Sequence, residues 1–192
     1  MNGIYWDCDG TLMDTERSYG LAWKEHLSDF GLEISEEEMR QWFGIDDRLV
    51  HSFYAKNVDL ENFDKTMASL GKIIEETLNE KLLFQDAKIL LEETNNRGWT
   101  SACVSASPYE LLKNKLIKAN IFDYFSYVIG GDQVERNKPY PDIYNKAISE
   151  LQTTKNIVIE DSPPGISSGK GSGSFVVAID RGCLLYTSPS PR

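Results

Sequence analysis

Gly3-Ile-Tyr-Trp-Asp-Cys-Asp-Gly-Thr-Leu12 is an apolar run that ends in two aspartates one residue apart. In a strand, the side chains of residues i and i+2 point to the same face, so Asp7 and Asp9 are expected to leave the end of a buried strand together. Gly10 then permits a sharp turn. Two neighbouring carboxylates repel each other and are costly to desolvate. The pair therefore either meets a divalent cation or an electrophilic phosphorus, or lies in a solvated turn.

The composition indicates a globular chain with an acidic balance. Its 192 residues are 41% hydrophobic and 26% charged, and 30 Asp and Glu against 20 Lys and Arg give a net charge of −10. This length suffices for a sizeable core plus an insertion. The acidic balance argues against a nucleic-acid partner, which needs clustered Lys and Arg, but it permits a small anionic substrate held by a metal and local cations. No apolar run approaches membrane-spanning length, so no membrane partner is expected.

The N-terminus and the cysteines both favour a reducing cytoplasm. The chain enters its first strand without a basic region or a secretory apolar segment. Cys8, Cys103 and Cys183 show no metal-type spacing, and the first two lie in expected strands, where a free cysteine is usually buried. Residues 183–192 resemble a translated sequencing adaptor, and we interpret them as a non-native tail rather than as an ordinary disordered one.

Periodicity divides the rest of the chain into a helical block and an alternating block. Residues 15–82 show helical periodicity and no strand, and Ser35 and Glu38 form an expected capping box. After this block, strands expected at 100–105, 127–130, 156–160 and 175–179 alternate with helices at 86–97, 109–119 and 142–151. Alternation predicts an α/β, Rossmann-like parallel sheet covered by helices on both faces. The core then comprises residues 1–14 plus 83–182, and residues 15–82 form an inserted all-α domain.

A low-complexity stretch, Ser-Ser-Gly-Lys-Gly-Ser-Gly-Ser, occupies residues 167–174. A nucleotide-binding phosphate loop needs four residues between Gly and Gly-Lys, followed by Ser or Thr. Here three residues separate Gly165 from Gly169, and Gly171 follows the lysine. We therefore reject the phosphate loop and expect a flexible or poorly formed helix, because Gly and Ser lower helix propensity.

Polar groups follow four of the expected strands, where ligands bind in parallel α/β sheets. Besides Asp7 and Asp9, they are Ser105 and Ser107 after the second strand, Lys138 in a proline-stiffened loop after the third, and Glu160 and Asp161 after the fourth. Each alone has an ordinary explanation as a turn serine, a solvated lysine or an exposed acidic turn. Their succession along one sheet edge favours a single site.

These segments resemble the motifs of the haloacid dehalogenase superfamily of phosphohydrolases, in the subgroup with a helical cap inserted after the first strand. The matching segments are Asp7-Cys-Asp-Gly-Thr-Leu12, Ser105, Lys138-Pro-Tyr-Pro-Asp142 and Glu160-Asp-Ser-Pro-Pro-Gly-Ile166. The resemblance runs to about residue 182 and implies that residues 15–82 are the cap.

The resemblance implies a phosphatase that forms a covalent intermediate with a small phosphorylated metabolite. Asp7 would attack the phosphorus in line and become an aspartyl-phosphate. Asp9 would protonate the departing alcohol and then deprotonate the hydrolytic water. Dehalogenases of the same superfamily attack carbon and lack the second aspartate, so Asp9 argues against that activity.

The resemblance also implies a Mg²⁺ cofactor and a phosphate-binding pair. The ion would sit on the Asp7 carboxylate, the Asp9 main-chain carbonyl and Asp161, with Glu160 assisting directly or through water. The transferring oxygens would be held by Ser105 and Lys138, with Ser107 as a weaker candidate.

Two alternatives to hydrolysis stay open, a sugar-phosphate mutase and a catalytically silent fragment, the latter motivated by the tail. Mutases resembling β-phosphoglucomutase carry a cap histidine that shuttles protons. This chain has Tyr19 at that position, and the tyrosine favours hydrolysis over mutation. The cap loop 44–48 would choose the substrate. Arg48, with His51 nearby, would grip an anionic or hydroxylated leaving group, unless both are ordinary surface residues. Sugar phosphates and phosphoglycolate-like acids both fit.

Overall fold

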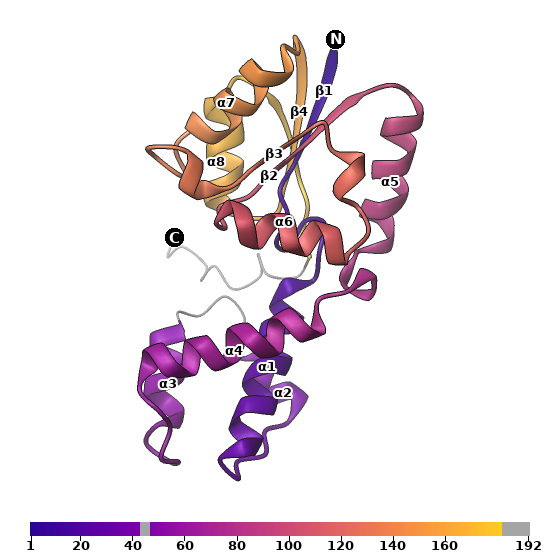
Figure 1. The fold of residues 1–192 in the computed structure, drawn as a ribbon. Helices are drawn as coiled ribbons and strands as arrows, with labels where there is room; N and C mark the ends of the chain where they lie inside the picture. Colours follow the sequence, from indigo (N-terminus) through magenta and orange to yellow (C-terminus); the bar gives the residue numbers. More distant parts are fainter. Residues whose placement is uncertain (43–46, 182–192) are drawn as a thin grey trace, which may run out of the picture. The chain divides into compact units, whose positions relative to one another are not determined.

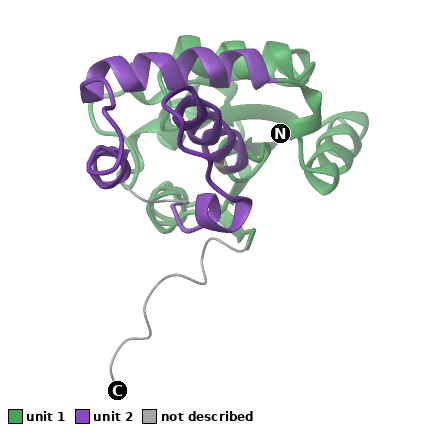
Figure 2. Ribbon diagram, turned by 90° about the horizontal axis from the view of Figure 1, so that it is seen from below, with its two compact units in different colours: residues 1–14, 79–192 green, residues 15–78 purple. Residues whose placement is uncertain are grey.

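The computed structural model describes residues 1–42 and 47–181. They fall into two compact units (Figures 1 and 2). Unit 1 comprises Met1–Asp14 and the chain from Asn79 onward, and unit 2 is Thr15–Leu78. None of the described helices combines the length and the apolarity that a bilayer crossing requires. The tail from Cys183 lies outside the described residues.

A parallel five-stranded sheet forms the centre of unit 1, as the alternation predicts. Its strands are β1 (Asn2–Trp6), β2 (Thr100–Val104), β3 (Tyr127–Ile129), β4 (Lys155–Glu160) and β5 (Phe175–Ala178). Their order is β3-β2-β1-β4-β5, with every pairing parallel. β1 is therefore central, and the chain steps to β2 on one side and later to β4 on the other. Ligands bind beside such a switch point.

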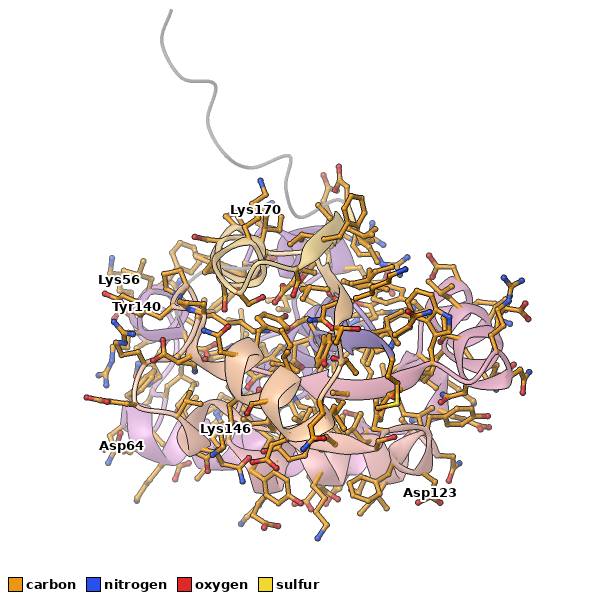
Figure 3. All side chains as sticks on the ribbon, turned by 90° about the horizontal axis from the view of Figure 1, so that it is seen from above. Lys56, Asp64, Asp123, Tyr140, Lys146 and Lys170 are labelled. Carbon is orange, nitrogen blue, oxygen red and sulfur yellow. The ribbon has the colours of Figure 1, made fainter. Side chains whose placement is uncertain are left out.

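Helices cover both faces of the sheet, which confirms the Rossmann-like class. They are α5 (Gln85–Asn96), α6 (Tyr109–Lys118), α7 (Asp142–Leu151) and α8 (Pro163–Gly171). α7 and α8 pack on one side of the strands and α5 lies on the other (Figure 1). Beneath α7 the buried cluster includes Tyr5, Val158 and Tyr144. Lys146 on α7 and Lys170 on α8 are exposed (Figure 3).

The first five residues of the glycine- and serine-rich segment, 167–171, lie in the helix α8, where a flexible or poorly formed helix was expected, and residues 172–174 follow its end. α8 is N-capped by Ser162, whose hydroxyl accepts a hydrogen bond from Gly165 N–H at 3.2 Å. A Cβ on Gly165 would overlap the Glu160 carboxyl group, and a Cβ on Gly169 would lie 2.8 Å from Val158. Small residues are needed because this helix lies very close to β4, and that packing outweighs their low propensity.

Unit 2 is helical throughout its described residues, as expected. Its helices are α1 (Thr15–Asp29), α2 (Glu36–Arg40), α3 (Asp47–Tyr54) and α4 (Phe63–Thr77). Ser35 caps α2 and accepts from Glu38 N–H at 3.1 Å. The Glu38 carboxylate instead accepts a hydrogen bond from the Tyr54 hydroxyl at 3.3 Å. The capping residue was thus predicted correctly, while its reciprocal partner serves to join α2 to α3.

Candidate active site

Asp7 is a buried carboxylate that is fixed at one oxygen only. It follows β1, where its backbone N–H donates to Ile159 O at 3.0 Å, and it is 6% exposed. Lys138 Nζ donates to Asp7 Oδ1 at 2.6 Å, whereas buried Oδ2 has no hydrogen-bond partner. Burial raises the pKa of Asp7 to about 8, although the Lys138 charge lowers it. Asp7 therefore has a defined orientation and one oxygen left for a cation or an electrophile.

Lys138 supplies the positive charge at this position. Its backbone N–H donates to the Asn137 side chain at 2.8 Å, which braces the loop before α7. Its side chain is 4% exposed, and Nζ lies 2.6 Å from Asp7 Oδ1, 2.6 Å from Glu160 Oε1 and 2.9 Å from Val104 O. Burial alone would lower the lysine pKa, but the charges of Asp7 and Glu160 outweigh burial and raise it. The ammonium group is therefore a permanent charge in the site.

Glu160 is completely buried and held by protein donors at both oxygens. Oε1 accepts from Lys138 Nζ and from the Tyr144 hydroxyl at 2.7 Å, and Oε2 accepts from Ser162 Oγ at 3.2 Å. Burial, followed by the Glu160 charge, raises the pKa of the Tyr144 hydroxyl, which stays a donor. Glu160 is thus a second counter-charge that fixes the ammonium of Lys138.

Asp161 brings a half-buried carboxylate from the end of β4 to the turn after β1. Its Oδ1 accepts a hydrogen bond from Thr11 Oγ1 at 3.3 Å. Burial, together with the Glu160 charge, raises its pKa to about 6. Gly10 has φ +83°, and a Cβ there would overlap the Asp161 carboxylate. The glycine of the first motif is needed both for its backbone conformation and for the approach of this acid.

These acids form a cluster suited to a hard divalent cation. One carboxylate oxygen from each of Asp7, Glu160 and Asp161 lies within 4.8 Å of the others. Three acids face the single ammonium of Lys138, so the cluster carries excess negative charge in a poorly solvated place. Oxygen ligands, a negative surplus and the unpartnered Oδ2 of Asp7 together fit a bound cation such as Mg²⁺.

Asp9 turns its carboxylate toward a different set of donors. Ser107 Oγ donates to Asp9 Oδ2 at 3.0 Å and Ser105 Oγ at 3.4 Å. Lys115 Nζ lies 2.5 Å from Asp9 Oδ1. Ser105 Oγ also accepts from Ser107 N–H at 3.1 Å, which orders the loop after β2. The structure thus places the core-site residues predicted from the sequence in two groups, Asp7 with Lys138, Glu160 and Asp161, and Asp9 with Ser105 and Ser107.

The family model for the haloacid dehalogenase-like hydrolases matches residues 4–179 of this chain. The chain belongs to this family. The match spans β2 to β5, most of β1 and the segment inserted after β1. The match confirms the resemblance to the haloacid dehalogenase superfamily that the sequence motifs indicate.

Curated relatives and solved structures agree with this family. The chain is 29% identical over 181 residues to the phosphorylated carbohydrates phosphatase of Thermotoga maritima, covering 90% of this chain and 82% of that protein. It is 25% identical over 184 residues to the fructose-1-phosphate phosphatase YqaB of Escherichia coli, and the alignment covers 92% of this chain and 95% of that protein. A Thermotoga maritima structure classed provisionally as a β-phosphoglucomutase superposes on this chain with a TM-score of 0.81 at 23% identity. The superposition covers 96% of this chain and 90% of that one, and it supports the fold. Together, the family and these phosphatase relatives make this hydrolase a phosphoric monoester hydrolase.

The two residues predicted for substrate choice lie in unit 2 of this hydrolase, where both have local partners. The Arg48 guanidinium stacks over the Phe63 ring at 4.4 Å. His51 Nε2 donates to Glu61 O at 2.9 Å, and its ring meets Phe63 edge-on. Residues 44–46 of the predicted specificity loop lie outside the described residues. The described contacts tie Arg48 and His51 to the start of α4, and their contact with a substrate stays a prediction.

Sequence reasoning missed two site residues of this hydrolase, Lys115 and Tyr144. Each lies on the buried stripe of its helix: Lys115 precedes buried Leu116 on α6, and Tyr144 follows buried Ile143 on α7. A lysine within an apolar helical stripe is a readable signal, because a buried ammonium needs a partner. Tyr144 carries no such signal, since a tyrosine in an apolar stripe usually serves as core.

Proposed function

We propose that this hydrolase is a Mg²⁺-dependent phosphatase that hydrolyses small phosphate monoesters through an aspartyl-phosphate on Asp7. The observation that carries the proposal is the asymmetric fixing of Asp7. Lys138 holds Oδ1 at 2.6 Å, and Oδ2 is left without a donor. A nucleophile that must meet phosphorus in line gains from such a fixed orientation, because alignment is the larger part of phosphoryl transfer catalysis.

Phosphoryl transfer to Asp7 places negative charge beside Lys138. The ammonium would hold one equatorial phosphoryl oxygen, and the Ser105 hydroxyl would donate to another. Glu160 keeps the ammonium in place while this happens. Asp161 and the Asp7 oxygen that does not attack phosphorus would hold Mg²⁺, which when bound offsets the charge of the phosphoryl group. In this assignment Glu160 acts mainly as the counter-charge of Lys138, since donors occupy both of its oxygens.

Asp9 is assigned the two proton transfers. As the ester P–O bond breaks and the Asp7–P bond forms, Asp9 gives its proton to the departing alcohol oxygen. In the second half it takes a proton from the water that attacks the phosphorus, so that Asp7 is released and inorganic phosphate forms. Its side chain is 32% exposed, which leaves it within reach of both groups.

The substrate class proposed is a sugar phosphate or a phosphoglycolate-like acid. Relatives of comparable length carry the names phosphorylated carbohydrates phosphatase, fructose-1-phosphate phosphatase and, in Aquifex aeolicus, phosphoglycolate phosphatase. We assign the choice among such esters to unit 2, as the cap, with Arg48 as the residue that meets the leaving group. Free buried Cys8 and Cys103 fit the reducing cytoplasm, where such metabolites occur.

The test is phosphate release from a panel of sugar phosphates and phosphoglycolate with Mg²⁺, with EDTA and Asp7→Asn as controls. Wild type should release phosphate, and both controls should abolish release. Asp9→Asn should retain labelled phosphate on the protein, because it blocks the second half-reaction, whereas Asp7→Asn should retain none. Activity that survives Asp7→Asn would refute the covalent mechanism, and a chain that releases nothing from any ester would be the silent fragment.

The same assay separates hydrolysis from the mutase alternative. A mutase would convert one sugar monophosphate into its positional isomer when primed with a bisphosphate, with little free phosphate. Tyr19, at the position of the mutase histidine, lies on α1 and is 39% exposed. A tyrosine exchanges protons poorly near neutral pH, which is why we favour hydrolysis.

A further inference from the structure

Lys115 is a buried lysine on α6 that the mechanism above leaves without a role. Its side chain is 4% exposed, and its helix neighbours Leu112 and Leu116 are fully buried. Its Nζ reaches Asp9 Oδ1 at 2.5 Å across 106 positions of sequence. Burying an ammonium is costly, and an apolar residue of similar length would pack on this stripe at lower cost. The position therefore calls for an explanation beyond packing.

The donors around Asp9 are divided between its two oxygens. Oδ1 meets the ammonium of Lys115, while Oδ2 receives the hydroxyl protons of Ser107 at 3.0 Å and Ser105 at 3.4 Å. A lysine on a packed helix is a fixed partner, whereas serine hydroxyls can rotate toward another acceptor. Oδ1 is thus the anchored oxygen, and Oδ2 is the one whose donors can yield to a substrate.

We propose that Lys115 is a positioning residue that orients the Asp9 carboxyl group so that Oδ2 exchanges protons with the leaving group and with water. This inference rests on the proposed function. When the ester P–O bond breaks, the proton moves from Asp9 to the alcohol oxygen, and the ammonium stabilises the carboxylate that remains. Without Lys115, the Asp9 side chain would keep its hydroxyl donors but lose the contact that fixes its rotation.

The experiment compares kcat/KM of Lys115→Met on two esters with different leaving groups, a sugar phosphate and p-nitrophenyl phosphate. An alkoxide must be protonated as it leaves, whereas p-nitrophenolate leaves without a proton. kcat/KM reports the steps up to Asp7 phosphorylation. We expect roughly a 10²-fold loss on the sugar phosphate, the usual scale of general acid catalysis, and a much smaller loss on the aryl ester. Lys113→Met, the same change at a half-buried position of α6, should leave both values near wild type.

A double-mutant comparison tests whether Lys115 acts through Asp9. In an Asp9→Asn background, which does not turn over, the readout is the single-turnover rate of Asp7 phosphorylation. There Lys115→Met should cause no further loss on the sugar phosphate, because the group it orients is already gone. Thermal unfolding of each variant checks folding, and Lys115→Gln, which keeps a polar donor, replaces Lys115→Met if the latter does not fold. Equal losses on both esters, or an additive loss in the double variant, would overturn this inference in an active enzyme. A wild-type chain that hydrolyses neither ester would instead overturn the proposed function and, with it, this role.

Discussion

Lys138 Nζ lies 2.6 Å from Asp7 Oδ1, although 131 positions separate the two residues in the chain. Both groups are buried, and neither would be tolerated there as an isolated charge. The pair also shares its ammonium with Glu160, so one lysine orders two acids.

Lys138→Met should lower kcat/KM for a phosphate ester about 10²- to 10³-fold, the usual scale for loss of one preorganised charge on a transferring group. It should also lower the free energy of unfolding, because Asp7 and Glu160 would remain buried without their cation. Lys170→Met, at an exposed lysine of α8 (Figure 3), is the matched control and should change neither quantity. Equal effects in the two variants would contradict the role of Lys138.

Mg²⁺ binding should release protons near neutral pH and tighten as pH rises. Burial raises the pKa of Asp7 to about 8 and that of Asp161 to about 6, so the metal-free site is partly protonated at neutrality. A cation needs the carboxylates and must displace those protons. Isothermal titration with Mg²⁺ in two buffers of different protonation enthalpy measures the release. Asp7→Asn should release fewer protons, and an affinity that does not change with pH would count against the assignment.

The same pKa values predict how the metal-free protein responds to pH. Both carboxyl groups hold protons in the native state that the unfolded chain, with ordinary values near 3.8, has already lost. The free energy of unfolding should therefore fall as pH rises through about 6 and then about 8, and saturating Mg²⁺ should reverse this fall. Urea unfolding at several pH values, with and without Mg²⁺, gives the comparison. Metal-free stability that rises over this range would contradict the pKa shifts.

Tyr144→Phe should destabilise the protein by about 1–3 kcal/mol while leaving its ring beneath Lys138. The substitution removes the 2.7 Å hydrogen bond to Glu160, a buried carboxylate, and deletes no packing. Tyr140→Phe removes a hydroxyl from an exposed ring (Figure 3) and should cost nothing measurable. Urea unfolding of both variants decides the matter, and indistinguishable midpoints would rule out an energetic role for the Tyr144 hydroxyl.

Gly165→Ala and Gly71→Ala should change stability in opposite directions. Alanine is the better helix former, so Gly71→Ala, which meets no atom within 4 Å, should stabilise α4 by about 0.5–1 kcal/mol. Gly165→Ala adds a Cβ that overlaps the Glu160 carboxyl group and should destabilise the protein in spite of that propensity. Thermal unfolding of the two variants provides the comparison. A stabilised Gly165→Ala would show that α8 can move away from β4 at little cost.

The parts of this structure that sequence could predict are those with local causes. Alternation of strands and helices predicts the parallel sheet, and strand periodicity places Asp7 and Asp9 together at the carboxyl end of its first strand. Two prolines beside Lys138 indicate an ordered loop. Packing distances have no such local signature. From sequence alone, Gly165 and Gly169 indicate only a poor helix former. Their packing role stays hidden because the side chains they approach, Glu160 and Val158, lie on another element.

The pairing of donors with acids was equally hidden from the sequence. The place of Lys115 in an apolar helical stripe indicates that its ammonium needs a partner, but only the fold shows that this partner is Asp9. Arg48 was expected at a leaving group; its guanidinium stacks over the Phe63 ring of its own unit, and its contact with a substrate stays a prediction. A long side chain can either reach a site or pack against a neighbour in its own unit, because local periodicity fixes only the direction of its Cα–Cβ bond.

The central place of β1 has a consequence for how the protein is made. This strand is synthesised before the other four strands of the sheet, yet one of its two neighbours, β4, begins only at Lys155. Until β4 is made, the second edge of β1 has no hydrogen-bonding partner. Asp7, which follows β1, also lacks Glu160, the acid that fixes the ammonium of Lys138. A nascent chain paused before that point would expose an unpaired apolar strand, so this protein depends on its late residues to shield its earliest ones from association with other chains.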